Sequence, residues 1–353
     1  MEINPIALWV IPVPDLGGVA RHALDVAETG IPGWKLVFLC PPGPLAEALR
    51  HRGAAVLVAD LGPQAGLPAS LRSLRRTVRT LRPAVVHTHL AYADIAGALA
   101  TRGLPVTLVS TEHGIADDDA VYHGSAARSK AMALAHRARI HAFDRLIAVS
   151  EATKAAMQTK WGPRQEIKVI RNGVDAGGPV TREPGGPLRV ASLSRLSPEK
   201  RIDRLLDAFA LVVAEQPDAR LTVAGTGPLL ADLKAQTVRL GIGEAVSFPG
   251  FVDASALLAA NDVIVQLSVW ENCSYTLLDA CAAGLGVVAT SVGGNPEILP
   301  PRCVVAAEDA QGVCAAVLSQ GLDPTQRPTL PPGWPTRLAM ADMLAATYEG
   351  AQR

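Results

Sequence analysis

Two acidic side chains, Glu271 and Asp279, stand eight residues apart in the stretch WENCSYTLLDACAAG. An apolar strand pattern ends just before Glu271, and a helix is predicted to begin near Ser274, which puts Asp279 about one turn inside it. Carboxylates in these positions can accept hydrogen bonds from sugar or ribose hydroxyls. The backbone N–H groups of the first helical turn, around Tyr275 and Thr276, can bind a phosphate. A cap formed by Thr276 and Asp279 is an equally good interpretation of Asp279.

Two cations follow another strand, in the stretch VASLSRLSPEKRIDRLLDAFA. Arg195 lies in the loop after the strand, and Lys200 lies close to a helix that we expect to start near Pro198, with Ser197 as its N-cap. An arginine fork and a lysine point charge beside a helix N-terminus are typical of an anion site. Taken alone, the same pattern also fits a solvated basic helix start.

Weaker signals lie in the first half of the chain. Gly17 and Gly18 separate a strand from a helix, where the absence of a side chain allows a ligand to approach the backbone. His113 follows a strand in the motif STEHG, where a structural role is the simpler interpretation. The run Asp117–Asp119 has the composition of a metal site, but its polar surroundings favour a solvated acidic loop. We therefore expect no metal site.

The elements that position these residues form a repeated pattern. Short apolar runs alternate with helical segments, which predicts parallel sheets covered on both faces, and the pattern occurs twice. A Gly- and Pro-rich stretch, residues 172–187, separates the two halves. We expect one Rossmann-like domain over residues 1–178 and a second over 179–335. A final helix, residues 336–352, is expected to pack back on the first domain.

Composition excludes several classes of protein. The 353 residues carry 33 basic and 33 acidic side chains, so the net charge of zero gives no indication of a nucleic-acid partner. No apolar run approaches the roughly 18 residues of a membrane span, and the start of the chain lacks the basic residues of a secretion signal. These features predict a cytoplasmic protein. The five cysteines lack CxxC spacing and are expected to be buried free thiols.

The motifs together resemble the family-4 retaining glycosyltransferases of the GT-B fold. The resemblance runs from residue 17 to residue 299 through GGVARH, VVHTHL, STEHG, LIAVSEATK, IKVIRNGVD, LSRLSPEKRIDRLLDAFA, VAGTGPL, VSFPGFV and ENCSYTLLDACAAGLGVVATSVGGNPEIL. The last of these is similar to the family's Glu-x7-Glu motif, with Asp279 in place of the second Glu. The resemblance implies an α/β GT-B architecture, in which two doubly wound Rossmann-like domains face a central cleft.

The resemblance also implies a role for each candidate residue. Arg195 and Lys200 would hold the diphosphate of a nucleotide-sugar donor, Glu271 would bind hydroxyls of the donor sugar, and His113 would sit beside the reacting sugar. These four form the implied catalytic set. The remaining implied donor-binding residues are Gly17, Gly18, Gly225, Gly227, Phe248, Val252, Ser274, Tyr275, Thr276 and Asp279.

The resulting prediction is a retaining glycosyltransferase that uses a UDP-sugar, or a GDP-sugar, and needs neither cofactor nor metal. Its hydroxyl acceptor would be a glycan, a lipid-linked molecule or a secondary metabolite. A non-catalytic sugar-binding protein and a nucleotide-sugar epimerase are the alternatives. Basic residues in 67–83 and 128–145 also allow a peripheral contact with anionic lipid at the inner membrane face, although a core-facing apolar stripe with a solvated basic face is the simpler interpretation of 67–83.

Overall fold

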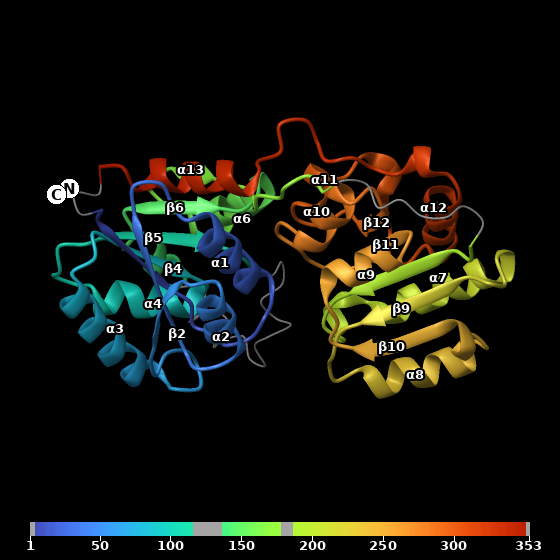
Figure 1. Cartoon of the computed structure of the whole chain (residues 1–353), viewed down its shortest axis with the longest axis horizontal. Helices are drawn as coiled ribbons and strands as arrows, with labels where there is room; N and C mark the ends of the chain where they lie inside the picture. Colours follow the sequence, from blue (N-terminus) through green and yellow to red (C-terminus); the bar gives the residue numbers. More distant parts are fainter. Residues whose placement is uncertain (1–3, 116–135, 178–185, 351–353) are drawn as a thin grey trace. The chain divides into compact units, whose positions relative to one another are not determined.

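A computed structural model describes residues 4–115, 136–177 and 186–350 of the chain. It divides into two compact units (Figure 1). The first comprises residues 1–173 and 335–353, and the second comprises residues 174–334. Each unit is a parallel sheet covered by helices, so the doubly wound α/β fold expected from the alternating pattern is confirmed.

The first unit contains a seven-stranded sheet in the order β3-β2-β1-β4-β5-β6-β7. Most of the residues that its strands bury are apolar, because helices cover both faces of a parallel sheet. The carboxyl halves of β4 and β5 are the exception, since residues 87–89 and 110–112 are polar and buried. The strands are β1 (Ile6–Val10), β2 (Lys35–Cys40), β3 (Ala55–Val58), β4 (Val85–His89), β5 (Thr107–Glu112), β6 (Arg145–Ala148) and β7 (Ile167–Val169). The helices are α1 (Gly18–Thr29), α2 (Pro44–His51), α3 (Leu67–Leu81), α4 (Ala91–Ala100) and α6 (Glu151–Trp161), with α13 (Arg337–Tyr348) from the end of the chain.

The helix α13 belongs to the first unit although its residues come last in the sequence. It packs beside α1, and Met340, Leu344 and Tyr348 are fully buried in the same apolar cluster as Trp9. The indole of Trp9 donates a hydrogen bond of 2.9 Å to the hydroxyl of Tyr348. Residues that follow the second unit in the sequence therefore complete the core of the first unit.

The second unit contains a six-stranded sheet in the order β10-β9-β8-β11-β12-β13. Its strands are β8 (Arg189–Leu193), β9 (Arg220–Ala224), β10 (Val246–Gly250), β11 (Val263–Gln266), β12 (Gly286–Thr290) and β13 (Val304–Val305). Its helices are α7 (Ile202–Glu215), α8 (Leu230–Arg239), α9 (Ala254–Ala260), α10 (Tyr275–Ala282), α11 (Asn295–Ile298) and α12 (Ala310–Leu322). The core is formed by the inward faces of α7 and α12 against the central strands.

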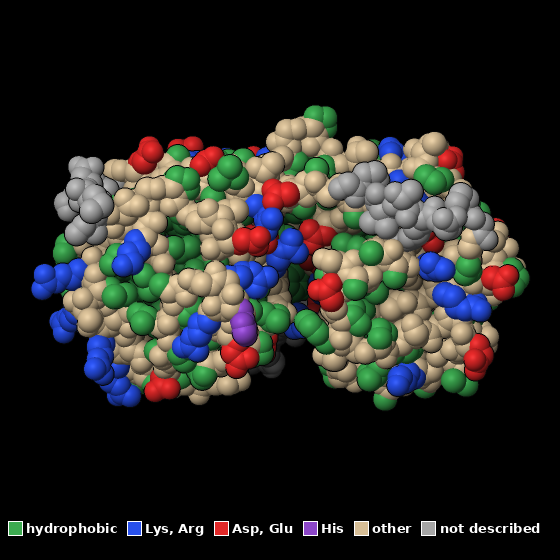
Figure 2. Space-filling model, in the orientation of Figure 1, with side chains coloured by type: hydrophobic (Ala, Val, Ile, Leu, Met, Phe, Trp, Pro, Cys, Tyr) green, Lys and Arg blue, Asp and Glu red, His purple; other side chains and the backbone are tan. Residues whose placement is uncertain are grey.

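The basic helix α3 buries an apolar stripe in the first unit. Leu74 and Val78 lie in its core, and the guanidinium of Arg75 donates hydrogen bonds to the carbonyls of Ala100 and Arg102 at the end of α4. The stripe thus faces the core, as the simpler interpretation predicted. Figure 2 shows basic side chains gathered on the surface over α3, where the exposed arginines are Arg72, Arg76, Arg79 and Arg82.

The five cysteines are free and buried, as the sequence predicted. Burial raises the pKa of the Cys40 thiol to about 11 and that of Cys281 to about 12. Both side chains are therefore uncharged thiols near neutral pH and serve as small apolar groups in the core.

Candidate functional site

The second unit has a topological switch point between β8 and β11. These strands pair with each other in the centre of the sheet, and the chain adds later strands outward from β8 in one direction and from β11 in the other. The loops that follow two such strands diverge and leave room for a ligand at the carboxyl edge of the sheet. Arg195 and Lys200 follow β8, and Glu271 follows β11, so the topology brings these candidates together.

The segment after β8 differs from the expected continuous helix. A 3-10 turn, Pro198–Lys200, comes first, and Arg201 then adopts a left-handed conformation with φ of 48° before α7 begins at Ile202. Ser197 stands at the N-cap position but gives no side-chain cap; its hydroxyl donates a hydrogen bond of 2.7 Å to Glu199. A 3-10 helix thus begins at Pro198, where a helix start was expected, but the kink at Arg201 delays the α-helix to Ile202.

Lys200 and Glu271 form an ion pair across the switch point. The Lys200 ammonium also lies 5.8 Å from the centre of the Trp270 ring. Only 15% of the Lys200 side chain and 14% of the Glu271 side chain is exposed, so Lys200 is not the solvated cation of the alternative interpretation. A backbone hydrogen bond of 2.8 Å from Val269 to Glu199 joins the same two loops. The pair is therefore held between two tethered segments and is well shielded from water.

Arg195 occupies a different environment. Its side chain is 69% exposed and pairs with Glu199 at 2.8 Å. Partial burial acts to raise the pKa of Glu199, but the hydrogen bond from Ser197, a backbone hydrogen bond and the charges of Arg195 and Lys200 together hold that pKa below its ordinary value. Glu199 is thus a carboxylate at neutral pH that holds Arg195 beside the turn without removing it from solvent.

Three glycines allow the loops around this pair to approach one another. A Cβ on Gly225, which has φ of 130°, would lie 1.8 Å from the Ser194 carbonyl oxygen, and one on Gly227 would lie 2.3 Å from that of Leu196. A Cβ on Gly293 would lie 1.6 Å from the carbonyl oxygen of Glu271. Gly225 and Gly227 therefore position the segment that carries Arg195, and Gly293, which sequence analysis did not single out, positions Glu271.

The helix α10 begins beside this pair. Ser274 is its N-cap, accepting a hydrogen bond of 3.4 Å from the backbone N–H of Leu277 and donating one of 2.8 Å to Gln266. Thr276 and Asp279 both lie inside the helix, so the alternative in which Thr276 forms the cap with Asp279 is wrong. Tyr275 is buried, whereas Thr276 and Asp279 are half-buried on the helix surface.

The two remaining candidates of the second unit are Phe248, in the edge strand β10, and Val252, just after that strand. Phe248 and Val252 are half-buried, and the carbonyl of Gly250 accepts a hydrogen bond of 2.7 Å from Gly225. Phe251, between them, is 73% exposed. A large apolar ring that the protein leaves in solvent next to these residues is a further candidate for ligand contact, and only the structure shows its exposure.

The first unit has its own switch point, between β1 and β4. Gly17 and Gly18 follow β1 at the start of α1, and among the described residues a Cβ on either glycine would meet no atom within 4 Å. His113 follows β5, which pairs with β4. The fold itself therefore does not require glycine at 17 or 18, which leaves open space beside the backbone where a ligand can approach.

His113 lies in a cluster of histidines around Trp9. Its Nε2 shares a hydrogen bond of 2.9 Å with Nδ1 of His89, and its ring centre is 4.9 Å from that of His22. His22 stacks on Trp9 at 5.4 Å between ring centres. The ring centres of His87 and His89 are 4.4 Å apart. His22, in the motif GGVARH, and His87 and His89, in VVHTHL, had no expected role, although strand alternation in VVHTHL already puts His87 and His89 on one face.

Burial keeps these rings neutral. It lowers the pKa of His22 to about 4, against a weaker opposing effect of its hydrogen bond with Asn172. The pKa values of His87, His89 and His113 also lie well below the ordinary value. Burial is the larger cause, and the charges of neighbouring histidines add to it. Near neutral pH, His113 is an uncharged imidazole whose orientation is set by its hydrogen bond with His89.

A buried ionic network supports the loop that carries His113. Arg139 pairs with Asp94 and, at 2.7 Å, with Glu112, and Glu112 accepts a hydrogen bond of 3.3 Å from the backbone of Gly114. Burial raises the pKa of Asp94 to about 6, against the opposing charge of Arg139. Glu112 is thus tied to the core on one side and to the loop around His113 on the other.

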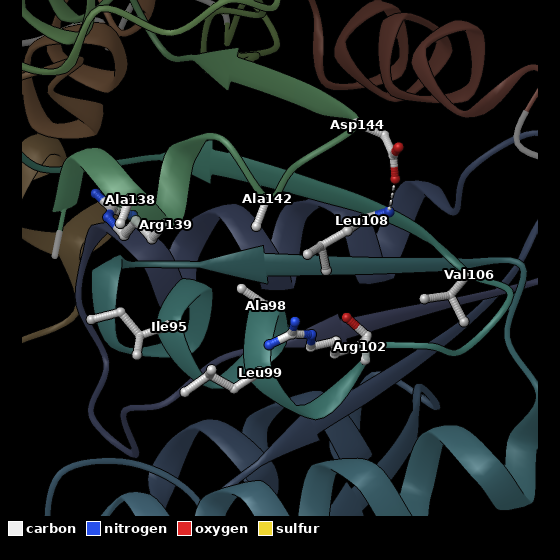
Figure 3. Close-up of a pocket in the computed structure, with 11 residues that line it drawn as sticks. Ile95, Ala98, Leu99, Arg102, Val106, Leu108, Ala138, Arg139, Ala142 and Asp144 are labelled. Atoms are coloured by element: carbon white, nitrogen blue, oxygen red, sulfur yellow. Dashed lines mark hydrogen bonds between the residues drawn. The ribbon is translucent and has the colours of Figure 1, made fainter.

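A hollow of about 600 Å³ lies elsewhere in the first unit (Figure 3). Its lining is mostly apolar and includes Leu108 near the start of β5, Arg102 after α4, and Asp144 before β6. These residues lie toward the amino ends of the strands, whereas His113 and His89 lie at the carboxyl ends. Arg139 also lines the hollow, so the hollow reaches the ionic network that supports the loop of His113. The run Asp117–Asp119 falls outside the described residues, as do 128–135 of the second basic segment.

Comparison with known proteins decides the class. Residues 16–177 match the family described as Glycosyltransferase Family 4, and residues 187–320 match Glycosyl transferases group 1. Each match covers one unit almost completely. The chain belongs to the family-4 type of glycosyltransferase. Glycogen synthase of Mycobacterium tuberculosis is 29% identical over 90% of this chain and 85% of its own length. The α-monoglucosyldiacylglycerol synthase of Streptococcus pneumoniae is 28% identical over 60% of this chain and 52% of its own length.

Solved structures support the same fold for this glycosyltransferase. HepE of Anabaena, determined in complex with UDP-glucose, matches with a TM-score of 0.77 at 21% identity over 97% of this chain and 94% of that chain. Sucrose-phosphate synthase of Thermosynechococcus elongatus matches with a TM-score of 0.75 at 18% identity over 99% and 96%. The GT-B assignment made from the motifs is therefore confirmed. Among the described residues, no helix combines the length and apolar composition needed to cross a membrane.

Proposed function

We propose that this glycosyltransferase moves a sugar from a nucleoside diphosphate sugar to a hydroxyl acceptor with retention of anomeric configuration and without a divalent metal. The observation that carries the proposal is the pair formed by Lys200 and Glu271 at the switch point of the second unit. The bond to be broken joins the donor sugar to the diphosphate. The ammonium of Lys200 suits the diphosphate, and the carboxylate of Glu271 beside it suits the hydroxyls of the sugar.

The positive groups of the site are explained by the charge of the leaving diphosphate. When the bond between C1 of the sugar and the diphosphate oxygen breaks, negative charge accumulates on the diphosphate. Arg195, Lys200 and the N-terminal amides of α10 stabilise that charge more strongly than they stabilise the intact donor, which is the condition for faster chemistry. Fixed cations and amides supply this stabilisation without a metal ion.

Retention follows if the acceptor attacks from the face that the leaving group vacates. The acceptor oxygen forms the new bond to C1, the bond between C1 and the diphosphate oxygen breaks, and the acceptor proton passes to a diphosphate oxygen. Glu271 orients the sugar through its hydroxyls, and neutral His113 offers a hydrogen bond beside the reacting sugar. No side chain is required as a nucleophile in this scheme.

UDP is the favoured nucleoside diphosphate, because HepE, which shares the fold, was determined with UDP-glucose; GDP remains the second choice. The acceptor is a hydroxyl of a glycan, a lipid-linked molecule or a secondary metabolite. The names of two relatives support the first two classes, since one is a glycogen synthase and another acts in making a glucosyl diacylglycerol. Exposed arginines on α3 would attract an anionic membrane that carries a lipid acceptor.

The reaction is tested with a panel of UDP- and GDP-sugars and candidate acceptors, using NMR to assign the anomeric configuration of the product. An α-linked product from an α-linked donor, formed equally well in EDTA, is expected. A β-linked product would refute retention, and activity that is lost in EDTA and restored by Mg²⁺ or Mn²⁺ would refute metal independence. Donor binding without transfer to any acceptor would favour the sugar-binding alternative, and conversion of the donor sugar to its epimer would favour the epimerase.

A further inference from the structure

Three histidines from separate elements of the first unit converge on one point. His22 lies in α1, His89 ends β4, and His113 follows β5, and each offers a ring nitrogen that lies within 4.8 Å of the nitrogens offered by the other two. Trp9 packs against this group, with its ring centre 5.4 Å from that of His22 and 4.3 Å from that of His89. Among the residues that the structure describes, no other cluster of His, Cys, Asp and Glu side chains has this geometry.

The rings have the chemistry of metal ligands. All three are neutral near pH 7, because burial lowers their pKa values, so each carries one ring proton and keeps one nitrogen lone pair. The Nε2 atom of His89 is buried and has no hydrogen-bond partner among the described residues. A polar atom buried without a partner is unfavourable, and ligation of a cation is one way in which such a nitrogen can be satisfied.

We propose that His22, His89 and His113 form a binding site for a borderline transition-metal cation such as Zn²⁺, and that occupation of this site inhibits sugar transfer. Three imidazoles with an open fourth position form a site that suits Zn²⁺. Imidazole also suits Co²⁺ and Ni²⁺, whereas Mg²⁺ prefers oxygen ligands. The site therefore favours different cations from those, such as Mg²⁺, that bind the oxygens of a diphosphate.

The required movement is small. Tetrahedral coordination with Zn–N distances of about 2.0–2.1 Å places ligand nitrogens roughly 3.4 Å apart. The 4.8 Å limit in this structure therefore leaves about 1.4 Å or less of closure between any two nitrogens. Ring rotation within the cluster can supply this. The proton shared between His89 and His113 moves to another ring nitrogen, and no proton has to leave the protein.

Inhibition follows from His113, and this part rests on the proposed function. A ring held by a metal ion cannot offer the same nitrogen to the reacting sugar, and the cation introduces positive charge into a neutral site. Binding of the metal does not depend on the reaction at all. Failure of metal binding and failure of sugar transfer are consequently separate results.

Metal binding is tested on tag-free protein by titration with Co²⁺, followed by displacement with Zn²⁺. We expect one Co²⁺ per chain with a visible absorption band of four-coordinate Co²⁺, and displacement of the band by Zn²⁺ but not by Mg²⁺. His22→Gln and His89→Gln should each weaken the affinity at least tenfold. His51→Gln is the matched control, because His51 is exposed on α2 and distant from the cluster in sequence; its affinity should equal that of the wild type.

The variants are checked for folding by thermal unfolding without metal. If one of the buried variants fails to fold, His113→Gln, at a half-buried position, provides the third test, and protection of the wild-type histidines from diethyl pyrocarbonate by Zn²⁺ provides a test that needs no variant. Absence of the Co²⁺ band, or an affinity that is the same in the wild type and in every folded cluster variant, would overturn the proposed site.

Inhibition is measured in the wild type and in His51→Gln with Zn²⁺ at tenfold its dissociation constant. At least a fivefold loss of transfer, reversed by EDTA, is expected in both proteins, with no loss at the same concentration of Mg²⁺. Full activity of the zinc-loaded protein would overturn the inhibitory role. A protein that binds zinc but transfers no sugar in either state would count against the proposed function and not against the site.

Discussion

The ammonium group of Lys200 and the carboxylate of Glu271, 71 residues apart in the chain, form an ion pair between the loops that follow β8 and β11. Each side chain is about six-sevenths buried, so each would be costly to leave without its partner. Lys200 has three donors and can contact a phosphate while it still holds Glu271. Under the proposed function, the pair would offer a cation to the diphosphate and a carboxylate to the sugar of the donor.

Removal of either cation should slow transfer. We expect Arg195→Ala and Lys200→Ala each to lose about 2–4 kcal/mol of transition-state stabilisation, the scale for removing one such donor. Steady-state kinetics with the best donor measures the change in kcat/KM. Arg204→Ala is the matched control, since Arg204 is an exposed arginine of α7 that pairs only weakly with its neighbours at 3.6 and 3.7 Å. Equal kinetics in Arg195→Ala and Arg204→Ala would remove Arg195 from the site.

Glu271 and Asp279 should separate sugar recognition from nucleotide recognition. Glu271→Gln should lower turnover and leave binding of the free nucleoside diphosphate unchanged, because its proposed partner is the sugar. Asp279→Asn should weaken the binding of the donor and of the free nucleotide alike, because the proposed partner of Asp279 is ribose. Calorimetry with the donor and with the free diphosphate distinguishes the two. Weaker diphosphate binding in Glu271→Gln would mean that Glu271 acts by holding Lys200.

Two glycine substitutions should have opposite effects. Gly17→Ala should leave the unfolding temperature unchanged, since its Cβ meets no atom in the described part of the chain, yet it should lower transfer if a ligand approaches the backbone there. Gly225→Ala should destabilise the protein by more than about 2 kcal/mol, because its φ of 130° and the nearby Ser194 carbonyl both oppose a side chain. Differential scanning calorimetry and an activity assay test both variants. A Gly17→Ala protein with normal activity would show that no ligand comes close at this position.

Stability should fall as the pH is lowered from about 6.5 toward 4. His22, His87, His89 and His113 have folded-state pKa values below the ordinary value, so the unfolded chain binds more protons in this window and gains in relative stability. His22 alone, with a pKa of about 4, corresponds to about 3 kcal/mol across the window. Asp94 acts in the opposite direction, because its raised pKa of about 6 makes the folded state bind a proton first.

On acidification, the destabilising effect of the four histidines should exceed the stabilising effect of Asp94, so the protein should lose stability. Chemical unfolding at pH 7, 6 and 5 measures this loss, and His22→Gln should reduce the dependence on pH relative to the wild type. The exposed His51 again provides the control substitution, which should preserve the wild-type slope. Stability that is constant or rises on acidification would mean that the cluster is protonated in the folded protein.

The exposed arginines of α3 should decide whether the protein binds lipid. If the helix contacts anionic membranes, the wild type should sediment with anionic vesicles at low salt and remain in solution with neutral vesicles. Changing Arg72, Arg76 and Arg79 to Gln should abolish sedimentation, since each base near the surface contributes on the order of 1 kcal/mol. Arg75→Gln is unsuitable as a control, because Arg75 bonds to the end of α4. If the wild type sediments with neither type of vesicle, these arginines serve only as a solvated surface.

Local sequence determined the repeated α/β pattern, the helices α1 and α10, and the glycosyltransferase motifs, because apolar periodicity and glycine-rich turns act over a few residues. The break at Arg201 was missed, since a left-handed residue other than glycine has no reliable local signal. The pairing of Lys200 with Glu271 and the convergence of His22, His89 and His113 were decided only by tertiary structure. Strand order in a parallel sheet depends on which crossovers pack best, and that choice alone brings the carboxyl ends of β1 and β4, and of β8 and β11, next to each other.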